Sequence, residues 1–184
     1  VLNDTAFIKP VLEMGPDGII IPQVLSAEDV QRAMDDCLYP PAGTRGFGPR
    51  RANRYAAVGD AEYLEQVHRS FLRIVQIEHV QAVRDIGRIV QVPYLDAIVI
   101  GPYDLSGSVG LLSQTRHPQV LSLAKQTLAA CKEAAVPCGV SIGPADTTYI
   151  DLWLSMGVDF ISCGDDLGFI KMGAEATLRH LKKQ

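Results

Sequence analysis

Five short apolar runs, each followed by a segment with helical spacing of its hydrophobic residues, most strongly limit what this chain can fold into. Each run is apolar throughout instead of alternating with polar residues, which is typical of strands in a parallel sheet covered on both faces. The runs lie near residues 18–24, 72–78, 95–101, 137–143 and 158–163. The sequence therefore predicts an α/β fold in which each strand precedes a helix. One of these helices is predicted over 80–90 and the last over 167–183, whereas the segment from Gly101 to Gln114 is predicted to be a loop.

The spacing of these strand–helix units suits two parallel architectures. Connections of this length occur in an open, doubly wound sheet and in a (β/α)8 barrel. Five units fall short of the eight that close a barrel. We therefore expect either an open α/β sheet or the later part of a barrel whose first strands lie outside the chain. No linker or low-complexity segment divides residues 1–184, which are predicted to form a single domain.

Charge, cysteine usage and hydropathy argue against several classes of protein. The net charge of -4 is unfavourable for a general binder of nucleic-acid phosphates. The four cysteines show no CxxC spacing, which favours reduced, buried thiols over a disulfide scaffold. No apolar run approaches the roughly 20 residues that span a bilayer. We therefore expect a soluble cytoplasmic protein that binds neither nucleic acid nor a membrane.

The segment 39–54 interrupts the alternation of strands and helices. Its prolines and glycines forbid a regular element. With Arg45 inside, such a loop is able to wrap an anionic ligand, although an ordinary rigid connector is an equally good interpretation. The group Arg45, Arg50, Arg51 and Arg54 is interpreted as a solvated loop and helix face.

Two of the predicted strands end in acidic residues. The run that begins at Leu95 leads through Gly101 to Asp104, and the preceding strand leads through Gln76 to Glu78. In parallel architectures ligands gather at the carboxyl ends of strands. Two carboxylates, a nearby amide and open backbone N–H groups form a hard-oxygen site that suits Mg²⁺ or Mn²⁺. An ion held there could act as a Lewis acid toward a 2-oxo acid.

Simpler interpretations of the same residues stay open at this point. Glu78 could be an exposed residue at a helix start, and Asp104 could cap a helix with its side chain on the backbone. Acid–base catalysis by the two carboxylates without a metal is a third alternative. Ser141, at another strand end, could touch a substrate or simply pack. Asp165 and Asp166 are equally able to cap the last helix.

Four motifs, taken in order, resemble the HpcH/HpaI aldolase family, the class II pyruvate aldolases with a barrel of the phosphoenolpyruvate/pyruvate type. They are YPPAGTRGFGPRRA, VQIEH, DAIVIGPYDLSGSVG and HPQV before a helix. The resemblance runs along the whole chain. It implies a (β/α)8 TIM barrel that here lacks its first three βα units.

The resemblance also implies a carbon–carbon lyase that cleaves or forms a bond of a 4-hydroxy-2-oxo acid through a pyruvate enolate. Pyruvate and an aldehyde would be its substrates, and Mg²⁺, Mn²⁺ or Co²⁺ its cofactor. By position, Glu78 and Asp104 would match the metal ligands and Gln76 a glutamine that contacts substrate. The Tyr103 amide would hold the pyruvate carboxylate, where relatives often carry Ala. Glu13 falls where relatives have an acidic residue that supports the catalytic histidine.

One departure from the family bears on activity. The histidine base and the enolate-stabilising arginine of relatives fall before the position of Val1, so residues 1–184 alone are expected to lack full aldolase activity. One alternative is a related lyase or synthase that uses the enolate with a citryl or malyl thioester or a pyrone. Another is a catalytically incomplete barrel fragment acting as a binding module. Relatives form homotrimers and homohexamers, with which Leu178 and Leu181 on the last helix are compatible.

Overall fold

The computed structural model describes residues 3–143 and 147–182, and its strands form one parallel sheet. The strands follow one another in the sheet in chain order, β1-β2-β3-β4-β5. They are β1 (Gly18–Ile21), β2 (Leu72–Ile77), β3 (Ala97–Ile100), β4 (Cys138–Ile142) and β5 (Phe160–Cys163). All five predicted strands are therefore confirmed, and each is somewhat shorter than its predicted range.

The helices fill the predicted positions with two differences. They are α1 (Thr5–Glu13), α2 (Ala27–Cys37), α3 (Asp60–Val67), α4 (Val80–Arg84), α5 (Ile86–Ile89), α6 (Pro102–Gly107), α7 (Pro118–Glu133), α8 (Thr147–Ser155) and α9 (Asp166–Leu181). The helix predicted over 80–90 breaks at Asp85. A short helix, α6, occupies a segment predicted as loop, where Pro102 at its first position has a fixed φ that suits a helix start. Lys183, predicted to end the last helix, lies outside the described residues.

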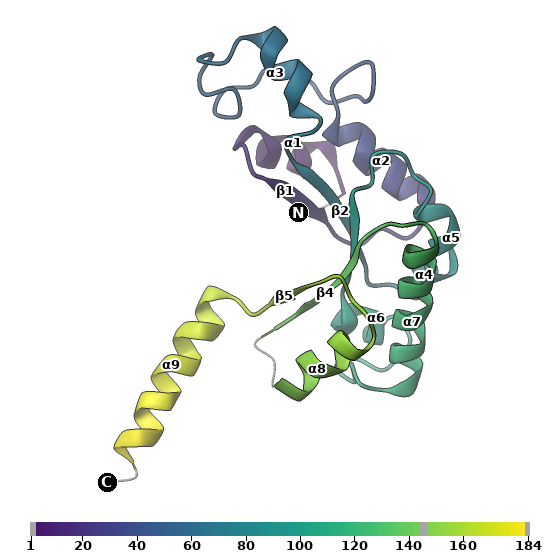
Figure 1. The fold of residues 1–184 in the computed structure, drawn as a ribbon, viewed down its shortest axis with the longest axis vertical. Coiled ribbons are helices and arrows are strands. Elements are labelled where there is room, and N and C mark those ends of the chain that lie inside the picture. Colours follow the sequence, from purple (N-terminus) through teal and green to yellow (C-terminus); the bar gives the residue numbers. More distant parts are fainter. Residues whose placement is uncertain (1–2, 144–146, 183–184) are drawn as a thin grey trace.

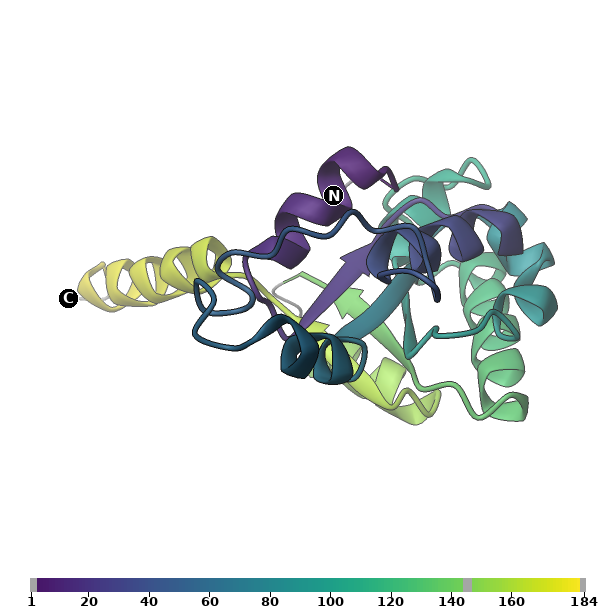
Figure 2. The ribbon, with the colours of Figure 1, turned by 90° about the horizontal axis from the view of Figure 1, so that it is seen from above.

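The strand order decides between the two architectures left open by the sequence. A right-handed crossover between neighbouring parallel strands places its helix on one face, and repeating it in the same direction keeps all helices on that face. A doubly wound sheet would reverse direction once. Helices α2, α4, α5 and α7 accordingly line the convex side of a curled sheet (Figures 1 and 2). The fold is a five-stranded parallel half-barrel, consistent with part of a TIM barrel.

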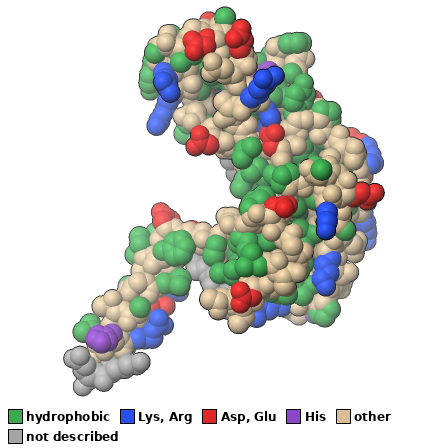
Figure 3. Space-filling model, viewed as in Figure 1, with side chains coloured by type: hydrophobic (Ala, Val, Ile, Leu, Met, Phe, Trp, Pro, Cys, Tyr) green, Lys and Arg blue, Asp and Glu red, His purple; other side chains and the backbone are tan. Residues whose placement is uncertain are grey.

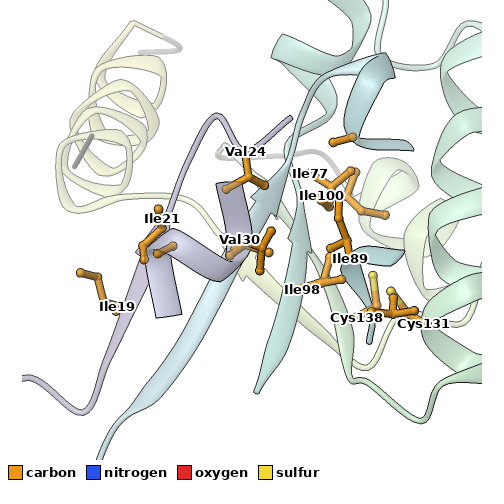
Figure 4. Close-up of a cluster of buried hydrophobic side chains, with 14 of the residues drawn as sticks. Ile19, Ile21, Val24, Val30, Ile77, Ile89, Ile98, Ile100, Cys131 and Cys138 are labelled. Atoms are coloured by element: carbon orange, nitrogen blue, oxygen red, sulfur yellow. The ribbon is translucent and has the colours of Figure 1, made fainter. Parts of the chain in front are cut away.

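The main core lies between the sheet and the helices of the convex side (Figure 4). In β2, Val75 and Ile77 are fully buried in it, whereas Ile74 and Gln76 face the concave side and are partly exposed. Ile20 of β1 is 42% exposed. The expectation that both faces are covered is therefore wrong for β1 and β2 in the described part of the chain, because no described helix covers the concave side.

Helix α9 stands away from the sheet, and none of its described residues is buried (Figure 1). Asp165 is its N-cap and accepts a hydrogen bond from the Gly168 amide at 2.7 Å, which confirms the capping interpretation. Figure 3 shows hydrophobic side chains on the surface of this helix and a hollow between it and the rest of the molecule. No helix in the described residues is both long and apolar enough to span a bilayer.

Candidate active site

Glu78 and Asp104 lie at the carboxyl edges of two neighbouring strands. Ile77, the last residue of β2, pairs with Ile100, the last residue of β3. Glu78 therefore begins one connection and Gly101 the next, side by side in the sheet. Asp104 lies in the first turn of α6, directly after that edge. Parallel pairing thus brings together two carboxylates that are 26 positions apart in the sequence.

Glu78 is a buried carboxylate with backbone and side-chain partners. It is only 5% exposed. One oxygen accepts a hydrogen bond from the Gln23 amide at 2.7 Å, and the other accepts one from the Gln76 side-chain amide. The N-cap of α4 is His79, whose imidazole accepts from the Gln81 amide at 3.2 Å. The interpretation of Glu78 as an exposed residue at a helix start is therefore wrong.

The pKa of Glu78 is raised above its ordinary value of 4.5. Burial is the largest cause, because it disfavours the charged carboxylate. The hydrogen bonds from Gln23 and Gln76 lower the pKa of Glu78, whereas the nearby Asp104 raises it. Two neighbouring carboxyl groups disfavour each other's charged form, and a cation between them would relieve the repulsion.

Gly101 has no side chain, and this leaves room for the side chains of Gln76 and Glu78 to meet. A Cβ atom at this position would lie 2.6 Å from Nε2 of Gln76 and 2.9 Å from Oε2 of Glu78. Across the site, Gln23 has a left-handed backbone with φ of 57°, which is uncommon for a residue other than glycine and aims its N–H at Glu78. Gln23 was missed because it falls inside the strand predicted near 18–24; Pro22 before it was the one available signal of an earlier strand end.

Asp104 is exposed and does not cap a helix. The N-cap of α6 is Gly101, and no side chain caps this helix, so the N-cap interpretation of Asp104 is wrong. Ser108, near the end of α6, donates to the Leu105 carbonyl at 2.7 Å and accepts from the Val80 amide at 3.0 Å. That hydroxyl ties the start of α4 to the end of α6, which fixes the two carboxylate-bearing connections to each other.

The other predicted substrate-binding residues lie along the same edge of the sheet. Tyr103 is 52% exposed, and its carbonyl accepts a hydrogen bond from the Ser106 hydroxyl at 2.6 Å. Ser141 of β4 is one position beyond Val140, which pairs with Ile100, so Ser141 lies in the row of Gly101 and Glu78. Two strand spacings, about 10 Å, separate it from β2. The structure brings Gln76, Glu78 and Asp104 together and places Ser141 farther along the edge.

Glu13 lies at the opposite edge of the sheet, because it ends α1 just before β1 begins. Its carboxylate accepts hydrogen bonds from Nη2 of Arg45 at 2.9 Å and from the hydroxyl of Tyr39 at 3.3 Å. Arg45 is only 2% exposed and its Cζ lies 4.4 Å from the centroid of the Tyr39 ring. Its interpretation as a solvated residue is therefore wrong, whereas Arg50, Arg51 and Arg54 are exposed as predicted.

The donor set at Glu78 and Asp104 fits a hard divalent cation. Within the described residues there is no group of three or more His, Cys, Asp or Glu side chains placed to hold a metal. Mg²⁺ is nevertheless often held by one or two carboxylates, with waters and substrate oxygens as its remaining ligands. A buried carboxylate beside a second, exposed one matches that pattern.

Comparisons with known proteins agree on one family. A family model described as HpcH/HpaI aldolase/citrate lyase matches residues 1–168. The hydroxypyruvate/pyruvate aldolase of Chromohalobacter salexigens is 34% identical over 183 residues, 98% of this chain and 70% of that protein. The 4-hydroxy-2-oxo-heptane-1,7-dioate aldolase of Shigella flexneri is 32% identical over 176 residues, 95% of this chain and 64% of that protein.

A solved structure gives the same result for the fold. The crystal structure of an HpcH/HpaI aldolase/citrate lyase family protein from Burkholderia cenocepacia superposes with a TM-score of 0.91 at 27% identity, over 98% of this chain and 71% of that chain. The present chain thus spans 64% to 70% of the length of the two aldolases named above.

Proposed function

Because the chain belongs to the HpcH/HpaI aldolase/citrate lyase family, we propose that it acts in a metal-dependent aldol reaction that cleaves or forms a C–C bond of a 4-hydroxy-2-oxo acid. The reaction would pass through a pyruvate enolate, with pyruvate and an aldehyde as the other reactants. The observation that carries the proposal is the position of the buried Glu78 beside the exposed Asp104 at the carboxyl ends of two neighbouring strands. The names of the two aldolase relatives support the substrate class.

Glu78 and Asp104 would hold the divalent cation, either Mg²⁺, Mn²⁺ or Co²⁺. Such an ion, when bound, stabilises negative charge on substrate oxygens as a Lewis acid. Gln76 orients Glu78 by donating a hydrogen bond from its side-chain NH2 group. The remaining N–H and the oxygen of the same amide would contact the substrate. The Tyr103 amide, in the uncapped first turn of α6, would donate to the pyruvate carboxylate. Ser141 would border the acceptor side of the pocket.

The half-barrel is proposed to be the later part of an eight-stranded barrel. The outermost strands of the sheet are β1 and β5, and each is paired with only one other strand of the sheet. On β1, Ile20 leaves apolar surface uncovered on the concave side, which three further βα units would cover. Those units would supply the histidine base and the enolate-stabilising arginine.

Glu13 is proposed to support such a base in a neighbouring subunit. Full aldolase activity in a purified protein with a mass near 20.0 kDa would contradict the requirement for the further units.

The protein is further proposed to form a homotrimer or homohexamer in the cytoplasm. The apolar side chains exposed on α9, such as Leu178 and Leu181, support contact with another subunit. Cysteines that are mostly buried and unpaired support a reducing compartment, although Cys163 is exposed, contrary to the expectation that all four are buried.

A related lyase or synthase that joins the enolate to a citryl or malyl thioester is the alternative within enzymes. The family description, which names citrate lyase beside aldolase, favours keeping it. A catalytically incomplete module is the alternative of a different class. Metal titration with pyruvate separates the enzymes from the module, because the module would show no metal-dependent pyruvate binding.

Solvent deuterium exchange into pyruvate tests the proposed function in the full-length protein. Exchange reports removal of a methyl proton, the step that gives the enolate, without any aldehyde. We expect Asp104→Ala to abolish metal-dependent exchange. Asp60→Ala is the matched control, because Asp60 also lies in the first turn of a helix and is exposed. Undiminished exchange in Asp104→Ala would overturn the assignment.

A further inference from the structure

Two cysteine side chains meet at the edge of the sheet opposite to Glu78. Cys131 lies near the end of α7, and Cys138 is the first residue of β4. Both are free thiols that are 1% exposed. Their sulfur atoms lie side by side in Figure 4, near enough for each thiol to shift the pKa of the other. Neither residue takes part in the proposed aldol reaction.

A cavity large enough for a small molecule lies next to the two cysteines. Its volume is about 600 Å³, and both cysteines line it. Lys125 and Lys132 of α7 contribute cationic groups to its wall, and Asp159 contributes a carboxylate. Asp159 accepts a hydrogen bond from the Cys138 amide at 2.8 Å, which holds the start of β4 in place. The thiols are therefore buried in the protein yet border a space large enough for a low-molecular-weight reagent.

The two thiols differ in acidity in a way that assigns them different roles. The neighbouring Cys138 thiol lowers the pKa of Cys131, while burial and the charge of Asp159 act in the opposite direction. The neighbouring Cys131 and burial raise the pKa of Cys138. The thiolate is the nucleophilic form of cysteine, so Cys131 is the residue suited to attack and Cys138 the one suited to complete the exchange.

We propose that Cys131 and Cys138 form a reversible redox site that a small-molecule disulfide oxidises to an intramolecular disulfide. The Cys131 thiolate attacks one sulfur of the reagent, whose other sulfur leaves as a thiolate and takes up a proton. Cys138 then loses its proton and attacks Sγ of Cys131, which releases the second thiol of the reagent. Two electrons pass from the cysteine pair to the reagent, and a dithiol reductant reverses the exchange.

Oxidation would link the end of α7 to the start of β4 across the connection 134–137. A cross-link of this kind stabilises a protein chiefly by restricting the unfolded chain. For so short a loop in a chain of this size, we expect a rise in Tm of roughly 5 °C. The bond lies at the edge of the sheet away from Glu78 and Asp104, so metal binding is expected to stay unchanged.

The test uses oxidised glutathione on a Cys163→Ser background, which removes the exposed thiol. After incubation and removal of the reagent, the denatured protein is assayed for free thiols, intact mass and linked peptides. We expect two thiols to disappear, the mass to fall by two hydrogen atoms, and one peptide pair to join Cys131 to Cys138. Two thiols that persist, or a stable glutathione adduct on Cys131 without the internal bond, would overturn the proposal.

Variants provide the matched comparison for this test. Cys131→Ser and Cys138→Ser should each prevent formation of the internal bond, whereas Cys37→Ser should leave it unchanged, because Cys37 is buried in α2. The mass and peptide measurements on the parent protein decide the proposal by themselves if one of these variants does not fold. Loss of the Tm rise after treatment with a dithiol reductant would show that the modification is reversible, as proposed, and a permanent rise would contradict it.

Discussion

At position 101 the site has room for a hydrogen atom and no side chain. A Cβ atom there would lie within 3 Å of both Nε2 of Gln76 and Oε2 of Glu78. We expect Gly101→Ala to push the Glu78 carboxylate aside and weaken Mn²⁺ binding by roughly 10- to 100-fold, the usual cost of disturbing groups that orient a ligand. Titration of the protein with Mn²⁺ measures this effect.

Gly87→Ala is the control for that substitution. Gly87 lies in α5, where a Cβ atom would have no neighbour within 4 Å. It should keep the Mn²⁺ affinity and stabilise the fold by about 0.5–1 kcal/mol, because alanine loses less backbone entropy than glycine in a helix. Equal Mn²⁺ affinities for the Gly101→Ala and Gly87→Ala variants would show that Gly101 has no part in positioning Glu78.

His68 makes the stability of the protein depend on pH. Its pKa is lowered from the ordinary value of 6.5, first because of burial and then because of the nearby charges of Arg73 and Arg45. Nε2 of the neutral ring accepts a hydrogen bond from the Tyr39 amide at 3.1 Å. Below the unfolded pKa the unfolded chain binds the proton more readily than the folded chain does, so this stabilisation is complete above pH 6.5 and is lost as the pH falls through the folded pKa.

We therefore expect His68→Gln to flatten the decline in the free energy of unfolding between about pH 7.5 and about pH 5.5. Glutamine keeps an acceptor for the Tyr39 amide and does not titrate. His180→Gln, on the exposed surface of α9, should leave the decline as it is in the parent protein. Urea unfolding at several pH values measures both, and an equal decline in His68→Gln would exclude this role for His68.

Two aromatic side chains, Tyr149 and Trp153, anchor helix α8 to the core, and Trp153 is the more deeply buried. Trp153 is fully buried, whereas the next residue, Leu154, is 55% exposed. We expect Trp153→Ala to lower the free energy of unfolding by about 3–5 kcal/mol, the usual range for removing a buried aromatic side chain. Leu154→Ala should change it by no more than about 0.5 kcal/mol. Chemical denaturation measures both, and similar losses would show that α8 is held by other contacts.

The strands and most helices could be predicted from local patterns, because apolar runs and helical spacing are properties of neighbouring residues. Helix α6 was missed because Gly101, Pro102 and the following polar residues are equally typical of a turn. The burial of Arg45 was missed for another reason. Its partners, Glu13 and Tyr39, are distant in the sequence or lie in the same irregular loop, and no local pattern reports such a contact.

Contacts between residues distant in the sequence also limited what could be predicted about the site. The placement of Glu78, Asp104 and Gln76 at the same end of the sheet could be predicted because the carboxyl ends of parallel strands lie together. The Gln23 amide could not, because it reaches Glu78 through a left-handed backbone that no motif indicates. The connection lengths alone suit both a barrel and a doubly wound sheet; the family resemblance favoured the barrel, and the strand order agrees with it.

For the whole molecule, α9 is the element whose exposed apolar side chains support the proposed assembly. Ile170 on this helix is 68% exposed although it is strongly apolar. If α9 packs on a neighbouring subunit as proposed, Ile170→Asp should shift the mass measured by sedimentation equilibrium toward that of a monomer, because a carboxylate is costly to bury. The neighbouring Lys171→Asp should leave the mass unchanged, since Lys171 carries a charged head that is 76% exposed. A parent protein that sediments as a monomer would contradict the proposed assembly.

The pairing of Glu78 with Asp104 is the centre of the proposed chemistry, and Mn²⁺ binding in the presence of pyruvate tests it most directly. We expect one Mn²⁺ per chain, displaced by Mg²⁺ and bound more tightly with pyruvate present. Glu78→Gln and Asp104→Asn should each weaken binding by at least about 10-fold, and Asp60→Asn should not. Unchanged Mn²⁺ affinity in both site variants, or no Mn²⁺ binding by the parent protein, would contradict the assignment of these two carboxylates as metal ligands.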